Sequence, residues 1–224
     1  MRKAFELKHI VPRSSMIGGM TAKWGIGDGR SPIWDNNLVG RWDARTFPDG
    51  ALATIPNTAT LADKAPDLTV TGATMASGTL QFDGVGDFAE TKGFLFPKRF
   101  TIFWDIDWLG KVNGNAGITH PEDLYLYNYA ALGKLRCYIK NTLADGIPNT
   151  NVGISTAGEY YSKSGTATDF TGPIGEGAHV GGLSIGFNPH GDTFTQMGFR
   201  QLLIFNKELS QAEVNEVLRV MFPA

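Results

Sequence analysis

Cysteine is almost absent from this sequence, which has one among 224 residues. The single thiol, Cys137, excludes an intramolecular disulfide and a zinc site built on cysteines, and its strand context predicts a small buried side chain. The four histidines are scattered and lack the spacing of metal ligands. An excess of one charge is also missing, because the formal net charge is −2. The sequence therefore argues against binding to nucleic acid or to an anionic membrane.

Long apolar runs are missing as well. No window approaches the roughly 18 apolar residues that a membrane-spanning helix needs. Arg2 and Lys3 resemble the start of an export leader, but charged residues and proline interrupt every apolar stretch that follows. We therefore expect a chain that is made in a cytosol and stays there unless the cell is lysed or a leaderless route exports it.

Short β-type segments follow one another from Leu38 onward, separated by glycines and by turn pairs such as Asp83-Gly84. In the longest, 100–108, the even positions are apolar and the odd positions include Asp105 and Asp107, which is typical of a half-buried strand. Residues 141–177 are rich in Gly, Thr, Ser and Asn, and we expect loops there with one short strand near 152–154. The other expected strands are 38–43, 68–70, 80–82, 85–88, 124–129, 135–139, 179–187 and 199–205.

Only the C-terminal segment is convincingly helical. Ser210 and Glu213 form a capping-box pattern, and Leu209 with Val214 can form the hydrophobic staple around it. An apolar stripe follows at helical spacing. Many short strands and one small helix predict an all-β, two-sheet jelly-roll sandwich with a short C-terminal helix.

Residues 1–36 differ from the rest. They are basic and punctuated by glycines, and their apolar residues follow neither a strand nor a helix period. We expect an extended N-terminal arm over 1–36, used for docking or oligomerisation or packed on its own domain, and a sandwich domain over 37–224. The apolar residues of this arm are Ile10, Val11, Ile17, Met20, Trp24 and Ile26.

Two segments go beyond a generic sandwich. Residues 80–88, LQFDGVGDF, resemble the F-D-G-x-G-D-Y/F strand–turn–strand of laminin G-like, concanavalin A-like lectin domains. Residues 197–214, MGFRQLLIFNKELSQAEV, are similar to the family's closing strand and helix, I-x-N-R-x-L-S-x-x-E-I, with Lys207 in place of the arginine. The two stand in the family's order, so the resemblance covers about 38–224. It implies a jelly roll that often binds carbohydrate and sometimes calcium, but no single activity.

Sugar binding needs exposed aromatic rings against the sugar's C–H surfaces and polar groups that reach its hydroxyls. Tyrosines alternate on the 124–129 strand, and a tyrosine pair lies in the polar 141–177 region. The alternatives are packing between the sheets for the first group and a short strand that anchors a loop for the second. The predicted carbohydrate-binding residues are Tyr125, Tyr127, Tyr129, Tyr160 and Tyr161, with Asn128 or Asn151 as the polar residue that hydrogen-bonds the sugar hydroxyls.

Calcium is the one metal for which the sequence offers ligands, and we expect no required cofactor. Asp83 and Asp87 in the family-like turn carry the hard oxygen atoms that calcium prefers. The alternative is that Asp83 caps its own turn through hydrogen bonds to the backbone.

Paired carboxylates raise the question of glycoside hydrolysis, because Asp105 and Asp107 lie on one face of a strand. A resemblance to glucanases of this fold would require Glu-x-Asp-x-x-Glu, and the segment lacks both glutamates. Ser-His-Asp, His-Glu-x-x-His and phosphate-loop patterns are missing too. The sequence therefore predicts no enzymatic activity and a solvated polar strand face.

A lectin-like sandwich, a basic arm and the lack of a leader together predict a structural component of a bacteriophage particle, such as a capsid decoration, head fibre or tail accessory protein. Its location would be the virion, and the arm would contact other virion proteins or symmetry mates while the sandwich adheres to glycans. The alternative is a stand-alone bacterial carbohydrate-binding module, and a glycoside hydrolase comes third.

Overall fold

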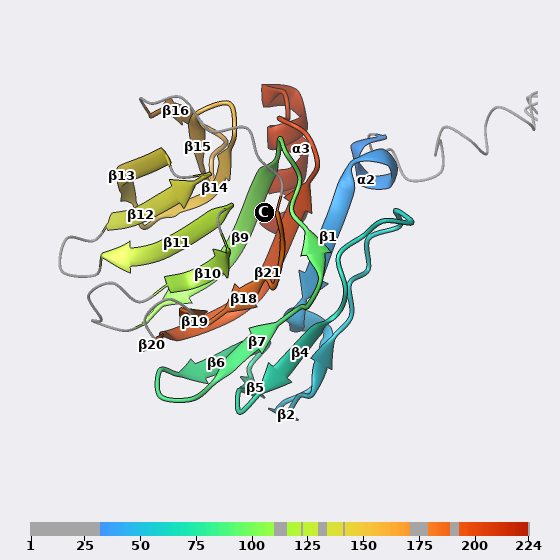
Figure 1. Cartoon of the computed structure of the whole chain (residues 1–224), viewed down its shortest axis with the longest axis vertical. Helices are drawn as coiled ribbons and strands as arrows, with labels where there is room; N and C mark the ends of the chain where they lie inside the picture. The colour runs from blue at the N-terminus through green and yellow to red at the C-terminus, as the bar shows by residue number, and fades with distance from the viewer. Residues whose placement is uncertain are drawn as a thin grey trace, which may run out of the picture. The chain divides into compact units, whose positions relative to one another are not determined.

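The structure is a computed structural model that describes residues 32–109, 116–121, 123–129, 134–140, 142–170, 179–188 and 193–223. Two large antiparallel sheets form a jelly-roll sandwich, and a helix covers the outer side of one of them (Figure 1). The fold class and the short C-terminal helix expected from the sequence are therefore confirmed. In the described residues, no helix is long and apolar enough to cross a membrane.

Sheet A contains the long strands β9 and β21 at its centre. Its order is β16 (Ala167–Asp169), β15 (Glu159–Ser162), β14 (Asn151–Ser155), β9 (Thr101–Trp108), β21 (Gln196–Phe205), β6 (Thr79–Asp83), β5 (Thr74–Ala76) and β2 (Gly50–Ala51), with β1 (Leu38–Asp43) also paired with β21.

Sheet B lies opposite. Its order is β13 (Thr142–Pro148), β12 (Lys134–Ile139), β11 (Leu124–Tyr129), β10 (Ala116–His120), β18 (Ser184–Ile185), β7 (Phe88–Glu90), β4 (Leu68–Thr71) and β3 (Thr54–Ile55). Among the described residues, two small ribbons and three short helical elements complete the domain. They are β8 (Phe94–Leu95) with β17 (Val180–Gly181), β19 (Phe187–Asn188) with β20 (Thr193–Phe194), α2 (Ile33–Asn36), the 3₁₀ turn η2 (Ala44–Thr46) and α3 (Gln211–Met221).

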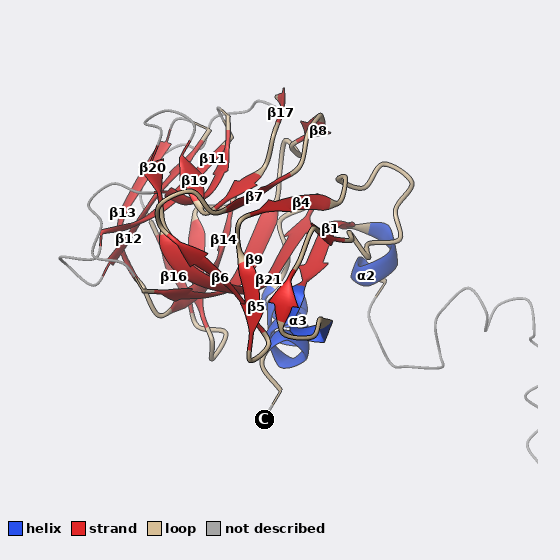
Figure 2. Ribbon diagram, turned by 90° about the horizontal axis from the view of Figure 1, so that it is seen from below, coloured by secondary structure: helices blue, strands red, loops and turns tan. Residues whose placement is uncertain are grey.

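The first part of β9, residues 101–105, is buried on both faces, which corrects the expected half-buried strand there. Ile102 and Trp104 point into the core between the sheets, as the alternation predicts. Phe103 points the other way, into a second apolar layer beneath α3. Figure 2 shows this order of layers, with α3 on one side of β9 and β21 and with β4, β7 and β11 on the other.

Helix α3 begins at the predicted capping box. The Ser210 backbone N–H donates to Glu213 Oε2 at 2.8 Å, and the Ser210 hydroxyl oxygen accepts from the Glu213 N–H at 3.5 Å. The predicted apolar stripe is buried against sheet A together with Leu209, so burial of this face holds the helix in place. The stripe consists of Val214, Val217, Leu218 and Met221.

Residues 33–36, which the sequence analysis assigned to the arm, pack on the sandwich. The chain divides into the units 1–32 and 33–224. Ile33 and Trp34 of α2 are buried in the layer beneath α3, and the Trp34 indole N–H donates to Glu216 Oε1 at 2.7 Å. Residues 33–36 therefore belong to the sandwich. The arm residues predicted to dock lie outside the described residues; they are Ile10, Val11, Ile17, Met20, Trp24 and Ile26.

The short strand expected near 152–154 is confirmed as β14, but the expectation of loops in the rest of the described part of 141–177 is wrong. Residues 142–170 form β13 and then β14, β15 and β16, which cross from sheet B to the edge of sheet A. The polar composition hid these strands because β16 and β13 are the edge strands of their sheets, where one side of the strand has no neighbour.

Candidate functional site

Three tyrosines gather on the face of sheet B that points away from the core. Tyr125 and Tyr127 come from β11, and Tyr138 comes from the neighbouring strand β12, directly opposite Tyr125 in the register. Their orientation follows from strand alternation, because the intervening side chains fill the core between the sheets. Those core residues are Leu124, Leu126, Cys137 and Ile139.

The three rings contact one another and form what we call the tyrosine face, defined as Tyr125, Tyr127 and Tyr138. The ring centroids of Tyr125 and Tyr127 are 5.3 Å apart, and Tyr127 stacks on Tyr138 at 6.3 Å with an interplanar angle of 17°. Tyr138 is 37% exposed, whereas Tyr127 is only 7% exposed. Burial raises the pKa of both Tyr125 and Tyr127, so their phenols stay neutral at physiological pH. Tyr138 is thus the ring available to a ligand.

A charged pair borders these rings. Arg136 Nη2 lies 2.6 Å from Asp145 Oδ2, and Arg136 also hydrogen-bonds Tyr127. The hydrogen bond from Arg136, together with the Gly146 N–H, lowers the pKa of Asp145. Sugar-binding sites combine an aromatic surface, on which the sugar ring packs, with hydrogen-bond donors and acceptors in fixed positions that contact its hydroxyls.

Two other predicted sugar-binding residues of the same strand cannot be assigned to this face. Asn128 and Tyr129 lie in β11, but their side chains are outside the described part of the structure. Tyr138 was missed by the sequence analysis, although pairing the predicted 124–129 and 135–139 strands would have placed it opposite the tyrosines.

Tyr160 and Tyr161 do not form a surface platform, and this prediction is corrected. Tyr161 is 1% exposed, stacks on Phe103 at 5.8 Å and donates its hydroxyl to Glu159 Oε2 at 2.7 Å. Tyr160, on the opposite face of β15, packs partly buried against the core between the sheets. The reason is that β15 is covered on both faces, since the layer beneath α3 covers one face and the core between the sheets covers the other.

Asp83 and Asp87 accept hydrogen bonds from backbone N–H groups of the turn in which they lie. Asp83 Oδ1 accepts from the Val85 and Gly86 N–H groups at 2.7 and 3.1 Å, and these bonds lower the pKa of Asp83. Asp87 Oδ2 accepts from the Asp83 N–H at 3.0 Å. Within the described ranges, no three His, Cys, Asp or Glu side chains converge as metal ligands. The structure therefore adds no further ligand to the calcium prediction there.

Asp105 and Asp107 are bridged by one arginine, which corrects the interpretation of a solvated strand face. Arg200 of β21 reaches Asp105 Oδ1 at 2.8 Å and Asp107 Oδ2 at 2.5 Å, and Asp105 is only 6% exposed. The hydrogen bond from Arg200 lowers the pKa of Asp107. Asp107 is therefore ionised at neutral pH, whereas a general acid in glycoside hydrolysis needs a raised pKa.

A buried charged cluster lies at the start of β11 and was not foreseen. Lys140 Nζ contacts Asp123 Oδ1 at 2.7 Å, and both side chains are almost fully buried. His120 Nδ1 and His179 Nδ1 each lie 3.2 Å from an Asp123 oxygen. Burial alone would raise the pKa of Asp123, but hydrogen bonds from His120 and Lys140 lower it to about 2. No spacing in the sequence indicates this cluster, because the turns of the fold bring its members together.

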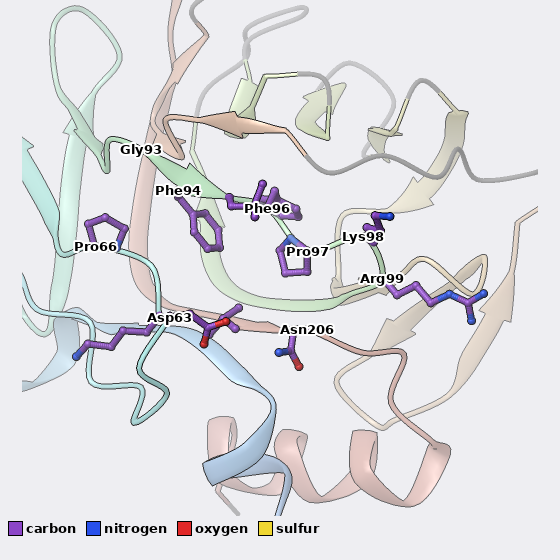
Figure 3. A pocket seen from close by; sticks show the side chains of 12 residues that line it. Asp63, Pro66, Gly93, Phe94, Phe96, Pro97, Lys98, Arg99 and Asn206 are labelled. Atoms are coloured by element: carbon purple, nitrogen blue, oxygen red, sulfur yellow. The ribbon is translucent and has the colours of Figure 1, made fainter.

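A groove of about 720 Å³ lies between the 63–66 loop and the 93–99 segment. Figure 3 shows Phe94 and Pro97 on one side of it and Asp63 and Asn206 on the other. Its lining includes more basic than acidic side chains, so the local potential is positive. The basic lining residues are Lys64, Lys98 and Arg99.

No family model matches this sequence, and a search of curated proteins gives no match. The structure does match solved structures. Trypanosoma rangeli sialidase in complex with sialic acid matches with a TM-score of 0.58 and 16% identity over 83% of this chain and 33% of the sialidase chain. A mutant of that sialidase that displays trans-sialidase activity matches with a TM-score of 0.57 and 15% identity over 81% of this chain and 32% of the mutant chain.

The receptor-binding domain of the botulinum neurotoxin C/D mosaic serotype is also similar, with a TM-score of 0.59 and 13% identity over 84% of this chain and 51% of that chain. The chain thus spans about a third of the sialidases and about half of the neurotoxin domain. At these identities the likeness shows a shared β-sandwich fold.

The comparison corrects one prediction. The sequence analysis excluded enzymatic activity, and that exclusion no longer holds because the matched structures include enzymes, the sialidases. The likeness assigns no reaction to this chain.

Proposed function

We propose that this chain is a glycan-binding module of the lectin-like, laminin G-like type and that it binds sugar on the tyrosine face. The observation that carries the proposal is the contact of Tyr125, Tyr127 and Tyr138 beside the Arg136–Asp145 pair. The solved structures that match this fold support the proposal, since one of them holds sialic acid and another is a receptor-binding domain.

A glycan array tests this proposal. We expect the full chain to bind a defined set of glycans, and we expect Tyr138→Ala to weaken that binding about fivefold, because a stacked ring contributes on the order of 1 kcal/mol. Tyr138→Phe keeps the ring and should retain most of the affinity. Val85→Ala, which alters a side chain that is 77% exposed on a distant turn, is the matched control. Binding that is equal in all four proteins would refute the proposal.

The finer proposal places this module on a bacteriophage particle, as a capsid decoration, head fibre or tail accessory protein in the virion. Its support is the basic, glycine-punctuated segment that precedes the sandwich and carries unpatterned apolar residues. Mass spectrometry of density-gradient-purified particles should detect the chain at a stoichiometric copy number. If the purified particles lack the chain, the phage proposal fails, and the same domain is then proposed to be a stand-alone carbohydrate-binding module.

A further inference from the structure

The tyrosine face has more positive than negative charge beside it. Lys134, Arg136 and Tyr138 occupy the even positions of β12, whereas its odd positions are buried in the core, so these three side chains leave the sheet on one side. Asp145 of the neighbouring strand β13 extends to the same side, because its Oδ2 lies 2.6 Å from Arg136 Nη2. The described residues of β11, β12 and β13, which lie side by side in Figure 1, thus present two cations and one anion around Tyr138.

The anion of this group is already paired, and one of the cations is not. Asp145 accepts from Arg136 Nη2 and, at 2.8 Å, from the Gly146 N–H. Lys134 is exposed, and among the described residues its ammonium has no hydrogen bond or ion pair. The Lys134 charge acts on Asp145 as well, but the carboxylate is bonded to Arg136. One positive charge is therefore left without a counterion at this face.

The Lys134 ammonium lies within reach of a sugar that packs on Tyr138. Its Nζ is 3.8 Å from the position that a Cβ on Gly146 would take. The register of β12 with β13, which shifts at this point, places Gly146 opposite Arg136. The ammonium is therefore at the level of Arg136, two residues or about 7 Å along β12 from Tyr138. An acidic group on the bound sugar ring, or on the next sugar unit, reaches it.

We propose that the tyrosine face selects acidic saccharides, with one sugar ring packed on Tyr138 and a carboxylate or sulfate group bound by Lys134. The lysine ammonium offers such a group a full charge and three hydrogen-bond donors. The overall charge of −2 gives no general attraction for anions, so the preference depends on this local cation. The inference rests on the proposed function, because it names the class of sugar that the same face takes.

A glycan array on which each acidic glycan has a neutral counterpart tests this selectivity. It carries sialyllactose and lactose sulfate beside lactose, and trigalacturonic acid beside its methyl ester, so it also separates carboxylate from sulfate recognition. The full chain should bind at least one acidic glycan at least about threefold more tightly than its neutral counterpart. That advantage should vanish in about 1 M sodium chloride, where the screening length is about 3 Å. Equal binding of acidic and neutral counterparts, or a preference for the neutral ones, would overturn the inference.

Two variants of Lys134 separate this inference from the proposed function. Lys134→Met should weaken binding of the acidic glycan about threefold and leave its neutral counterpart unchanged, whereas Lys134→Arg keeps the charge and should retain the preference. Lys98→Met alters an exposed lysine of the 93–99 segment, outside the tyrosine face, and is the matched control. If Tyr138→Ala weakens glycan binding while Lys134→Met leaves every affinity unchanged, the proposed function stands and this inference fails. If no glycan binds, both fail.

Discussion

We expect Lys140→Met to lower the free energy of unfolding by about 3 kcal/mol. The substitution removes the ammonium that contacts Asp123 at 2.7 Å, while the carboxylate stays 0% exposed. Breaking a buried ion pair by removing one partner costs about 3–5 kcal/mol. The lower end applies here because His120 and His179 still hydrogen-bond the Asp123 carboxylate. Equilibrium urea denaturation of the full chain measures this change.

The control is Lys134→Met, which alters an exposed lysine of the neighbouring strand β12 and should change stability by less than about 0.5 kcal/mol. The double variant Lys140→Met with Asp123→Asn removes both charges and should recover part of the loss, because no isolated charge stays buried. A loss below about 1 kcal/mol for Lys140→Met, or a double variant whose loss equals the sum of the single losses, would refute the reasoning.

Three further predictions concern single sites. Because the pKa of Asp123 falls from 3.8 to about 2, its stabilisation, on the order of 2 kcal/mol, is present above about pH 4 and is lost toward pH 2; urea titrations across that range should show this in the wild type and not in Asp123→Asn. Ser210→Ala removes the α3 cap and should cost about 1 kcal/mol in the same assay, and an unchanged midpoint would contradict the capping box. Gly84→Ala should lower the thermal midpoint because φ is +79° and a Cβ would lie 2.9 Å from the Gln196 nitrogen; an unaltered melting curve would contradict that strain.

The sequence by itself determined those parts of the fold in which the pattern is local. The alternation in 100–108 predicts which side chains of β9 face the core between the sheets, because side chains of a strand alternate whatever lies around them, but it does not predict that the other face is buried beneath α3. The Ser210–Glu213 pair predicts the start of α3, because a capping box closes within one helical turn. Cys137 is buried as its strand context predicts, and burial raises the pKa of its thiol.

Only the tertiary structure decided which residues lie side by side when they are distant in sequence. Tyr138 lies opposite Tyr125 because of the strand register. Tyr161 is buried because α3 packs over the face of β15 that carries it. Arg200 meets Asp105 from a strand that lies 95 positions away. Composition and spacing carry no information about such pairings, because they depend on how the two sheets and the helix pack. That packing is what places the tyrosine face.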